Sequence, residues 1–204
     1  MNRLKNQPKI TYDSNIIVYY CFSTEFYKIS ELTERTHKLT EFLIKNNSKI
    51  IIPSFIVNEL NKVTFSKIVS DYLSNNEVTN LPKNPSFLFR IQLEGKIRKK
   101  FNSFLKKDWV SVENFVPNYN SIDGIINFFN MLEIHSKSQK FLNLKKRDTF
   151  KPSKEDINLI AFSKEMDSVL ISNDYDLTFF ADELYEKKLS GKIFSIRELN
   201  IFNN

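Results

Sequence analysis

Short apolar runs alternate with longer segments of helical periodicity at both ends of the chain. Compact β-branched runs predict four short strands, at 9–13, 49–52, 168–171 and 192–195. Apolar residues at near-helical spacing predict helices over 16–22, 31–46, 54–73, 154–166 and 177–189. This alternation predicts an α/β fold of three layers, α/β/α, in which helices cover both faces of a central, mainly parallel sheet.

The middle of the chain has a different pattern, without a strong strand candidate. A segment rich in Asn and Pro at 75–85 is typical of a linker. It precedes a basic amphipathic helix at 87–109, which Gly95 interrupts, and residues 121–147 are again helical in pattern. The sequence therefore predicts a core domain formed by residues 1–74 and 151–204, with a basic helical insertion at 75–150.

The composition fits a protein of the cell interior. The chain has 204 residues, 41% of them hydrophobic, and 19 Phe, which is enough for one packed domain with an insertion. No apolar run approaches the roughly 20 residues that a membrane-spanning helix needs. The N-terminus lacks the apolar region of a secretory signal, and the lone Cys21 indicates a reducing compartment. We therefore expect a soluble cytoplasmic protein that does not act at a membrane.

Positive charge is concentrated in the predicted insertion. Residues 61–150 carry 15 Lys/Arg against 8 Asp/Glu, whereas the rest of the chain carries 15 against 16. A solvated, lysine-rich face is one explanation, and an electrostatic footprint for a polyanion such as RNA is the other. If the second holds, the backbone phosphates would be bound by Arg90, Lys96, Arg98, Lys99, Lys100, Lys106 and Lys107.

Five carboxylates carry the candidate chemistry, because each one stands beside a short apolar run. They are Asp13, Glu59, Asp156, Asp174 and Asp176. In a parallel sheet, ligands gather beyond the carboxyl ends of the strands, so these acids are expected to converge there. Converging carboxylates raise one another's pKa unless a cation lies between them. Mg²⁺ or Mn²⁺, which prefer oxygen ligands, would resolve the repulsion.

Each acid also has an ordinary structural explanation. Asp13 can form an Asx turn or cap a helix, and Glu59 can lie at the boundary of its helix and pair with Lys62. Asp156 fits a capping box with Ser153, and acids are common in strand-to-helix turns such as the one around Asp174. The case for a site therefore depends on the complete set and its order along the chain.

That order resembles the PIN-domain nuclease superfamily. The matching stretches are YDSNIIVYY, KIIIPSFIVNEL and SKEDINLIAFSKEMDSVLISNDYDLTFFADEL, which cover roughly the first 65 and the last 50 residues. The resemblance implies a PIN-like fold and a divalent-metal-dependent endoribonuclease, with Mg²⁺ or Mn²⁺ as cofactor. It implies a catalytic quartet of Asp13, Glu59, Asp156 and Asp174, and metal ligands Asp13, Asp156, Asp174 and Asp176. It also implies supporting polar groups at Asn15, Ser172 and Asn173.

Several finer functions stay open at this stage. The long basic insertion resembles the protein-only RNase P (HARP) type, which would remove tRNA 5′ leaders. A toxin-type PIN ribonuclease and a non-catalytic RNA-binding or assembly module are also compatible with the same residues. The expected partner is single-stranded or tRNA-like RNA. Self-association is plausible, and nothing in the sequence indicates an antitoxin partner. The mechanism needs no histidine base, and both His37 and His135 are expected on helix surfaces.

Overall fold

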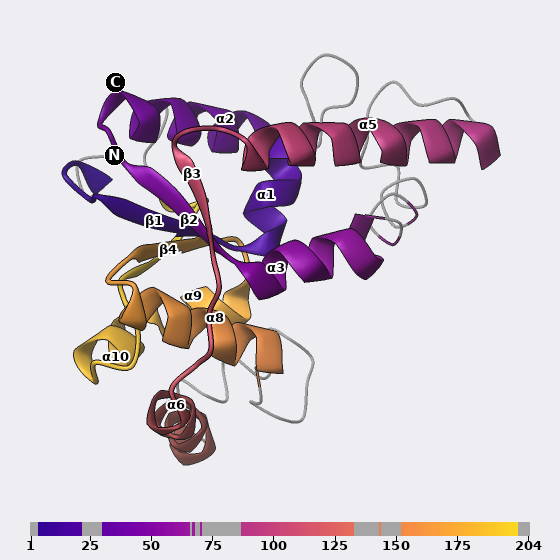
Figure 1. Cartoon of the computed structure of the whole chain (residues 1–204). Coiled ribbons are helices and arrows are strands. Elements are labelled where there is room, and N and C mark those ends of the chain that lie inside the picture. Colours follow the sequence, from indigo (N-terminus) through magenta and orange to yellow (C-terminus); the bar gives the residue numbers. More distant parts are fainter. Residues whose placement is uncertain are drawn as a thin grey trace.

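Five parallel strands form the centre of the computed structural model, in the order β3-β2-β1-β4-β5 (Figure 1). The structure describes residues 4–21, 30–65, 87–132 and 152–199, together with residues 67, 70 and 143. The strands are β1 (Lys9–Tyr12), β2 (Lys49–Pro53), β3 (Val110–Glu113), β4 (Val169–Ser172) and β5 (Ile193–Ser195). All four strand pairs are parallel. The predicted α/β class with a parallel central sheet is therefore confirmed.

Helices cover both faces of this sheet. They are α1 (Ser14–Cys21), α2 (Ser30–Lys45), α3 (Ser54–Glu59) with the π-helical turn η2 (Leu60–Thr64), α5 (Phe87–Leu105), α6 (Tyr119–Met131), α8 (Lys154–Glu165), α9 (Tyr175–Thr178) and α10 (Ala181–Glu186). Figure 1 shows α1, α2 and α5 on one side of the sheet and α8, with α6 beyond it, on the other. Among the described helices, none combines the length and the apolar character that a membrane span requires.

The β-branched runs form strands because both of their faces can be buried. Ile10, Ile50 and Ile171 are fully buried within β1, β2 and β4. Strands that are covered by helices on both sides are typically continuous apolar runs of this kind. Helix α2 contributes Leu39 and Leu43, one turn apart and fully buried, to the same core. The core thus fixes the strand ends that carry the acids.

The expectation that the middle of the chain lacks a strand is wrong. Strand β3 pairs with β2 from Ile50↔Val110 to Pro53↔Glu113 and forms one edge of the sheet. Its four residues include Ser111 and Glu113, and Val112 is 43% exposed, so the apolar pattern is too weak to predict a strand. Pairing with a buried neighbour overrides this weak local preference.

Two predicted helix features also change in the structure. Helix α5 runs through Gly95 without interruption, because Leu93, Ile97 and Phe101 bury one side of it and offset the cost of a helical glycine. The helix predicted at 177–189 is instead two short helices, α9 and α10, separated at the buried Phe180.

The division of the chain into a core and an insertion stays a prediction. Both of its boundaries, and the helical pattern predicted beyond residue 132, lie outside the described residues. Within the described part of 75–150, β3 joins the central sheet and α6 packs against α8. That part of the predicted insertion therefore contributes to the same layers as the predicted core.

Candidate functional site

The chain reverses its direction across the sheet between β1 and β4. It proceeds from β1 outward to β2 and β3, and then places β4 and β5 on the other side of β1. Such a reversal leaves a crevice beyond the carboxyl ends of the two central strands, where ligands bind. Asp13 directly follows β1, and its N–H donates to the Ile171 carbonyl of β4 at 3.1 Å. The first predicted acid therefore lies at the switch point of the sheet.

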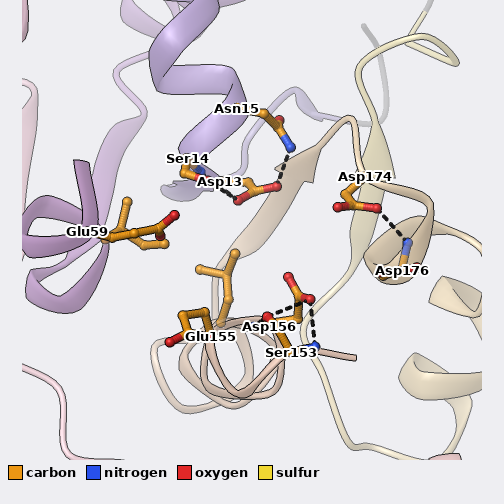
Figure 2. Close-up of a pocket in the computed structure, with 11 residues that line it drawn as sticks. Asp13, Ser14, Asn15, Glu59, Ser153, Glu155, Asp156, Asp174 and Asp176 are labelled. Atoms are coloured by element: carbon orange, nitrogen blue, oxygen red, sulfur yellow. Dashed lines mark hydrogen bonds between the residues drawn. The ribbon is translucent and has the colours of Figure 1, made fainter. Parts of the chain in front are cut away.

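An acidic cavity of about 560 Å³ opens at this switch point (Figure 2). Its walls come from the turn after β1, from α3, from the start of α8 and from the turn after β4. The lining residues are Asp13, Ser14, Asn15, Ile56, Glu59, Ser153, Glu155, Asp156, Leu159, Asp174 and Asp176. All five predicted carboxylates are among them, and no described lysine or arginine is. The structure therefore brings together acids from four separate stretches of sequence.

Asp13 is held at the base of this cavity by four hydrogen-bond donors. Its Oδ2 accepts from the Ser172 hydroxyl and from the Asn15 amide, both at 2.6 Å. Its Oδ1 accepts from the backbone N–H and the hydroxyl of Ser14. Four donors match the approximately four lone-pair positions of a carboxylate, so the orientation of Asp13 is fixed from the start of α1 and from the end of β4.

The acids of the cavity interact electrostatically. The pKa of the Asp13 carboxyl is raised to about 7, mainly by burial; the nearby charges of Asp156 and Asp174 also raise it, whereas the Ser172 and Ser14 hydrogen bonds lower it. Burial also raises the pKa of Asp156, with contributions from Asp174 and Asp176. Carboxylates that raise each other's pKa lie close enough for their negative charges to repel one another. A bound cation would relieve this repulsion.

Asp156 has the capping role that its sequence context predicts, and it also lines the cavity. The Ser153 hydroxyl accepts from the Asp156 N–H at 3.0 Å, while Asp156 Oδ2 accepts from both the N–H and the hydroxyl of Ser153. This reciprocal pair is the capping box of α8. The contacts hold Oδ2 at the helix terminus. The structural explanation and the site hypothesis for Asp156 are therefore compatible.

Asp174 combines the same two positions at the other wall. It is the N-cap of α9, and its Oδ1 accepts from the backbone N–H of Asp176 at 2.9 Å. Its own N–H donates to the Ser172 hydroxyl, which in turn donates to Asp13. Asp176 is 5% exposed and lies beside Asp174 at the start of α9 (Figure 2). Ser172 thus connects the backbone of one acid to the carboxylate of another.

The three predicted supporting groups join the turns after β1 and β4. Asn15 donates its amide to Asp13 and accepts the N–H of Asn173 on its Oδ1 at 3.2 Å. Asn173 donates its own amide to the hydroxyl of Tyr19 in α1 at 3.1 Å. Together with Ser172, these contacts set the relative position of Asp13 and Asp174.

The donor set of the cavity fits a hard divalent cation in chemical kind. Carboxylate oxygens suit Mg²⁺ and Mn²⁺, and the lining contains neither the cysteine nor the histidine that would favour zinc. Within the described ranges, no three acidic, histidine or cysteine side chains are grouped closely enough to hold one ion together. The carboxylates thus share a cavity but do not form a ready-made coordination sphere.

The predicted phosphate-binding cations lie on or just after α5, and none of them lines the cavity. Arg98 has a structural role, because it pairs with Glu94 at 2.8 Å and donates to the Asn61 carbonyl at 2.9 Å. Its guanidinium also lies over the ring of Phe65. The side chains that are exposed are Arg90, Lys96, Lys99, Lys106 and Lys107, whereas Lys100 is half-buried.

One histidine differs from its predicted position. His37 is half-buried in α2, with its ring 4.8 Å from that of Tyr20, and burial lowers its pKa. It packs in a helix interface because Tyr20 of α1 covers it, and it does not line the cavity. His135 lies outside the described residues.

Four further side chains of the site were not predicted from the sequence. Ser14, Ser153 and Glu155 line the cavity, and Arg197 donates from Nε to the Asn173 Oδ1 at 2.8 Å. Ser14 directly follows Asp13, and Ser153 precedes Asp156 by three residues. Their closeness to predicted acids is a signal that the sequence contains. Arg197 follows the end of a short strand, and that position alone could have indicated it.

Comparisons with known proteins give little beyond this geometry. No protein-family model and no curated protein matches the sequence. Among solved structures, the chain is similar to VapBC2 from Rickettsia felis bound to a DNA fragment from their promoter. The two share 14% sequence identity with a TM-score of 0.45, over 92% of this chain and 98% of that one. A similarity at this level supports no conclusion about function.

Proposed function

We propose that the chain is a divalent-metal-dependent endoribonuclease of the PIN-domain type. The observation that carries the proposal is the acidic cavity, in which acids from four stretches of sequence meet at the switch point of a parallel sheet. The order of these acids along the chain matches the PIN-domain motifs. A crevice at this point of an open α/β sheet is a common ligand site.

Asp13, Asp156 and Asp174 would hold Mg²⁺ or Mn²⁺, with Asp176 beside them. A bound ion of this kind lowers the pKa of water and neutralises charge on a phosphate group. Ser172, Asn15 and Ser153 keep the carboxylates oriented through the hydrogen bonds described above. Because Asp13 already accepts four hydrogen bonds, a cation would replace one donor. The bond from the Ser14 hydroxyl, at 3.2 Å, is the longest of the four, so its replacement by a cation would cost least.

Glu59 would act from the opposite wall. Figure 2 shows it entering the cavity from α3, facing the side that carries Asp174. It is half-buried and belongs to an element different from those of the three aspartates. A carboxylate in this position can orient a water molecule and accept its proton, provided that the water lies within hydrogen-bond reach.

Cleavage of defined RNAs tests the proposed activity. Purified protein should cleave single-stranded RNA with Mn²⁺ or Mg²⁺ and should lose that activity in excess chelator. Removal of a pre-tRNA 5′ leader at one position would favour the RNase P type, and cleavage at scattered single-stranded sites would favour a general or toxin-type nuclease. Binding without cleavage in the presence of either metal would contradict the enzyme and favour an RNA-binding module.

Metal binding can be tested without any activity assay. A ligand that binds only the folded protein raises its stability in proportion to the logarithm of its concentration. Mn²⁺ should therefore raise the unfolding temperature of the wild type, and Asp174→Asn should reduce this shift. Asp108→Asn, an exposed position outside the cavity, is the matched control. Cytoplasmic location and self-association stay predictions, and an antitoxin partner stays an open alternative that the sequence does not indicate.

A further inference from the structure

Arg197 lies at the same edge of the sheet as the acidic cavity. Strand β5 runs parallel to β4, with Ser195 paired to Ser172, and the Ile196 N–H donates to the Ser172 carbonyl at 2.9 Å. Arg197 therefore follows its strand at the level where Asn173 and Asp174 follow theirs. Parallel strands present their carboxyl ends on one edge, so this cation is next to the site in the plane of the sheet.

The backbone and the guanidinium of Arg197 are both fixed. Arg35 of α2 donates from Nη1 to the carbonyls of Arg197 and Leu199, at 3.4 and 3.2 Å. The Nε of Arg197 donates to Asn173 Oδ1 at 2.8 Å. Asn173 is itself tied to Asn15 and Tyr19. An exposed arginine is thereby attached, through one residue, to the turn that carries Asp174.

This attachment leaves the outer part of the guanidinium available. An arginine has five N–H donors in a planar fork, and only the Nε–H is used for Asn173. No described acidic side chain forms an ion pair with Arg197. The terminal nitrogens of such an anchored fork match the geometry of a phosphate group.

The negative charge of the cavity requires a nearby cation if an RNA strand is to bind there. Six carboxylates line it without a described lysine or arginine, and a polyanionic strand would be repelled before it reached them. The cations of α5 do not line the cavity, and Arg98 is committed to Glu94. Arg197, by contrast, is bonded to the residue next to Asp174.

We propose that Arg197 binds a phosphate group of the RNA strand beside the acidic cavity and that Asn173 positions its guanidinium for this contact. This inference rests on the proposed function, because it takes RNA as the substrate. It names the residue that holds the strand against the acids, and it places the strand across the turns after β4 and β5.

RNA binding as a function of salt tests the contact. The affinity for a fluorescent single-stranded RNA oligonucleotide is measured in chelator, between about 50 and 200 mM salt. One lost phosphate contact should lower the slope of log affinity against log salt by about 0.7. Arg197→Gln keeps a donor for Asn173 and removes the charge, so it should show this lower slope and bind about 5–10-fold more weakly at low salt. Arg197→Lys restores the charge and should restore the slope.

The control removes a charge from the opposite edge of the sheet. Lys49 is exposed at the first residue of β2, and Lys49→Ala should leave the slope unchanged. Wild-type slope and affinity in Arg197→Gln would overturn the inference, as would an equal loss in Lys49→Ala, which indicates a general charge effect. A merely structural role would alter the unfolding temperature without altering the slope, and thermal unfolding of each variant detects it.

The binding experiment, combined with the RNA cleavage assay, separates this inference from the proposed function. If the wild type neither binds nor cleaves RNA, the proposed function is wrong and the inference is overturned with it. If the wild type cleaves RNA, Asp174→Asn does not, and Arg197→Gln binds as the wild type does, only the role of Arg197 is wrong.

Discussion

Two charged regions of this molecule differ in how their residues come together. Ser172 and Asp13 are 159 residues apart in sequence, yet their side chains form a 2.6 Å hydrogen bond at the base of the acidic cavity. The cations of α5 are close neighbours in sequence, but Arg98 is used in structural contacts while Lys99, the next residue, is exposed. A position directly after a parallel strand therefore predicts membership of a shared site better than closeness along one helix does.

The physical reason is the geometry of each element. Parallel strands bring all their carboxyl ends to one edge, so an acid after each strand is carried to the same place. A helix completes a turn every 3.6 residues, so a run of cations on it is distributed around its circumference. The variants below test whether the acidic cavity and α5 differ in this way.

The largest effect is expected from pH, through Asp13. Its pKa in the folded protein is about 7, above the ordinary value of 3.8. Between these values the folded protein holds a proton that the unfolded chain has lost, so the free energy of unfolding falls as pH rises from about 4 to 7 and then levels off. From pH 5 to pH 8 the loss is roughly 2–3 kcal/mol. Asp13→Asn should lack this component.

Urea unfolding at these pH values, in chelator, measures the difference between wild type and Asp13→Asn. The exposed Asp108→Asn should keep the wild-type pH profile. If Asp13→Asn also keeps it, Asp13 is not the buried carboxyl with a raised pKa that the structure indicates, and the contrast with α5 is lost.

The next largest effect should come from the capping box, and it separates the role of Asp156 in capping α8 from its proposed role in binding metal. Ser153→Ala removes one partner of the capping box and should lower the free energy of unfolding by about 1 kcal/mol. Asn118 caps α6 through a bond from the Asn120 N–H, so Asn118→Ala is a matched loss of a cap away from the cavity. Both variants should lose similar stability in urea, but only Ser153→Ala should weaken Mn²⁺ binding. Equal Mn²⁺ shifts in the two would refute a link between the cap and the site.

A pair of substitutions on α5 tests the separation of its cations. Arg98→Ala removes the contacts to Glu94 and Asn61, and it should lower the free energy of unfolding by about 1 kcal/mol. Lys99→Ala, at the exposed neighbouring position, should change it by less than about 0.5 kcal/mol. Thermal and urea unfolding measure both. Equal losses of unfolding free energy in Arg98→Ala and Lys99→Ala would mean that the two cations contribute equally to stability, against the contrast between structural and exposed positions.

The smallest effect should be a gain in stability within α5. Gly95 is exposed in the middle of the helix, and an added Cβ would meet nothing within 4 Å. Gly95→Ala should therefore stabilise the protein by about 0.5–1 kcal/mol. If urea unfolding instead shows a lower free energy of unfolding, residue 95 needs a backbone conformation that alanine disfavours. The cations of α5 would then not lie on a regular helix.

The sequence predicted the parallel sheet and the acids of the cavity because strong local patterns encode both. Ile10, Ile50 and Ile171 lie in short runs with β-branched residues, which are typical of strands that helices cover on both faces. Asp13 directly follows such a run and Asp174 lies two residues after the end of another, so their convergence depended on strand order alone. Whether Asp13, Glu59, Asp156 and Asp174 act in catalysis stays a prediction.

Other features depend on tertiary contacts that local patterns do not encode. Strand β3 exists because β2 offers it an edge, and its own sequence is too short and polar to predict it. The structural use of Arg98 depends on the approach of Asn61 and Phe65 from another element. The anchoring of Arg197 depends on Asn173, which is close only because β4 and β5 pair.

The most direct test of the central claim is the rate of single-stranded RNA cleavage with Mn²⁺ by four proteins: wild type, Asp13→Asn, Asp174→Asn and Asp108→Asn. If the acids at the switch point form one metal-dependent site, the first two variants should lose on the order of 100-fold or more in rate while they stay folded, and Asp108→Asn should match the wild type. Cleavage by Asp13→Asn and Asp174→Asn within a few-fold of the wild-type rate would contradict the account.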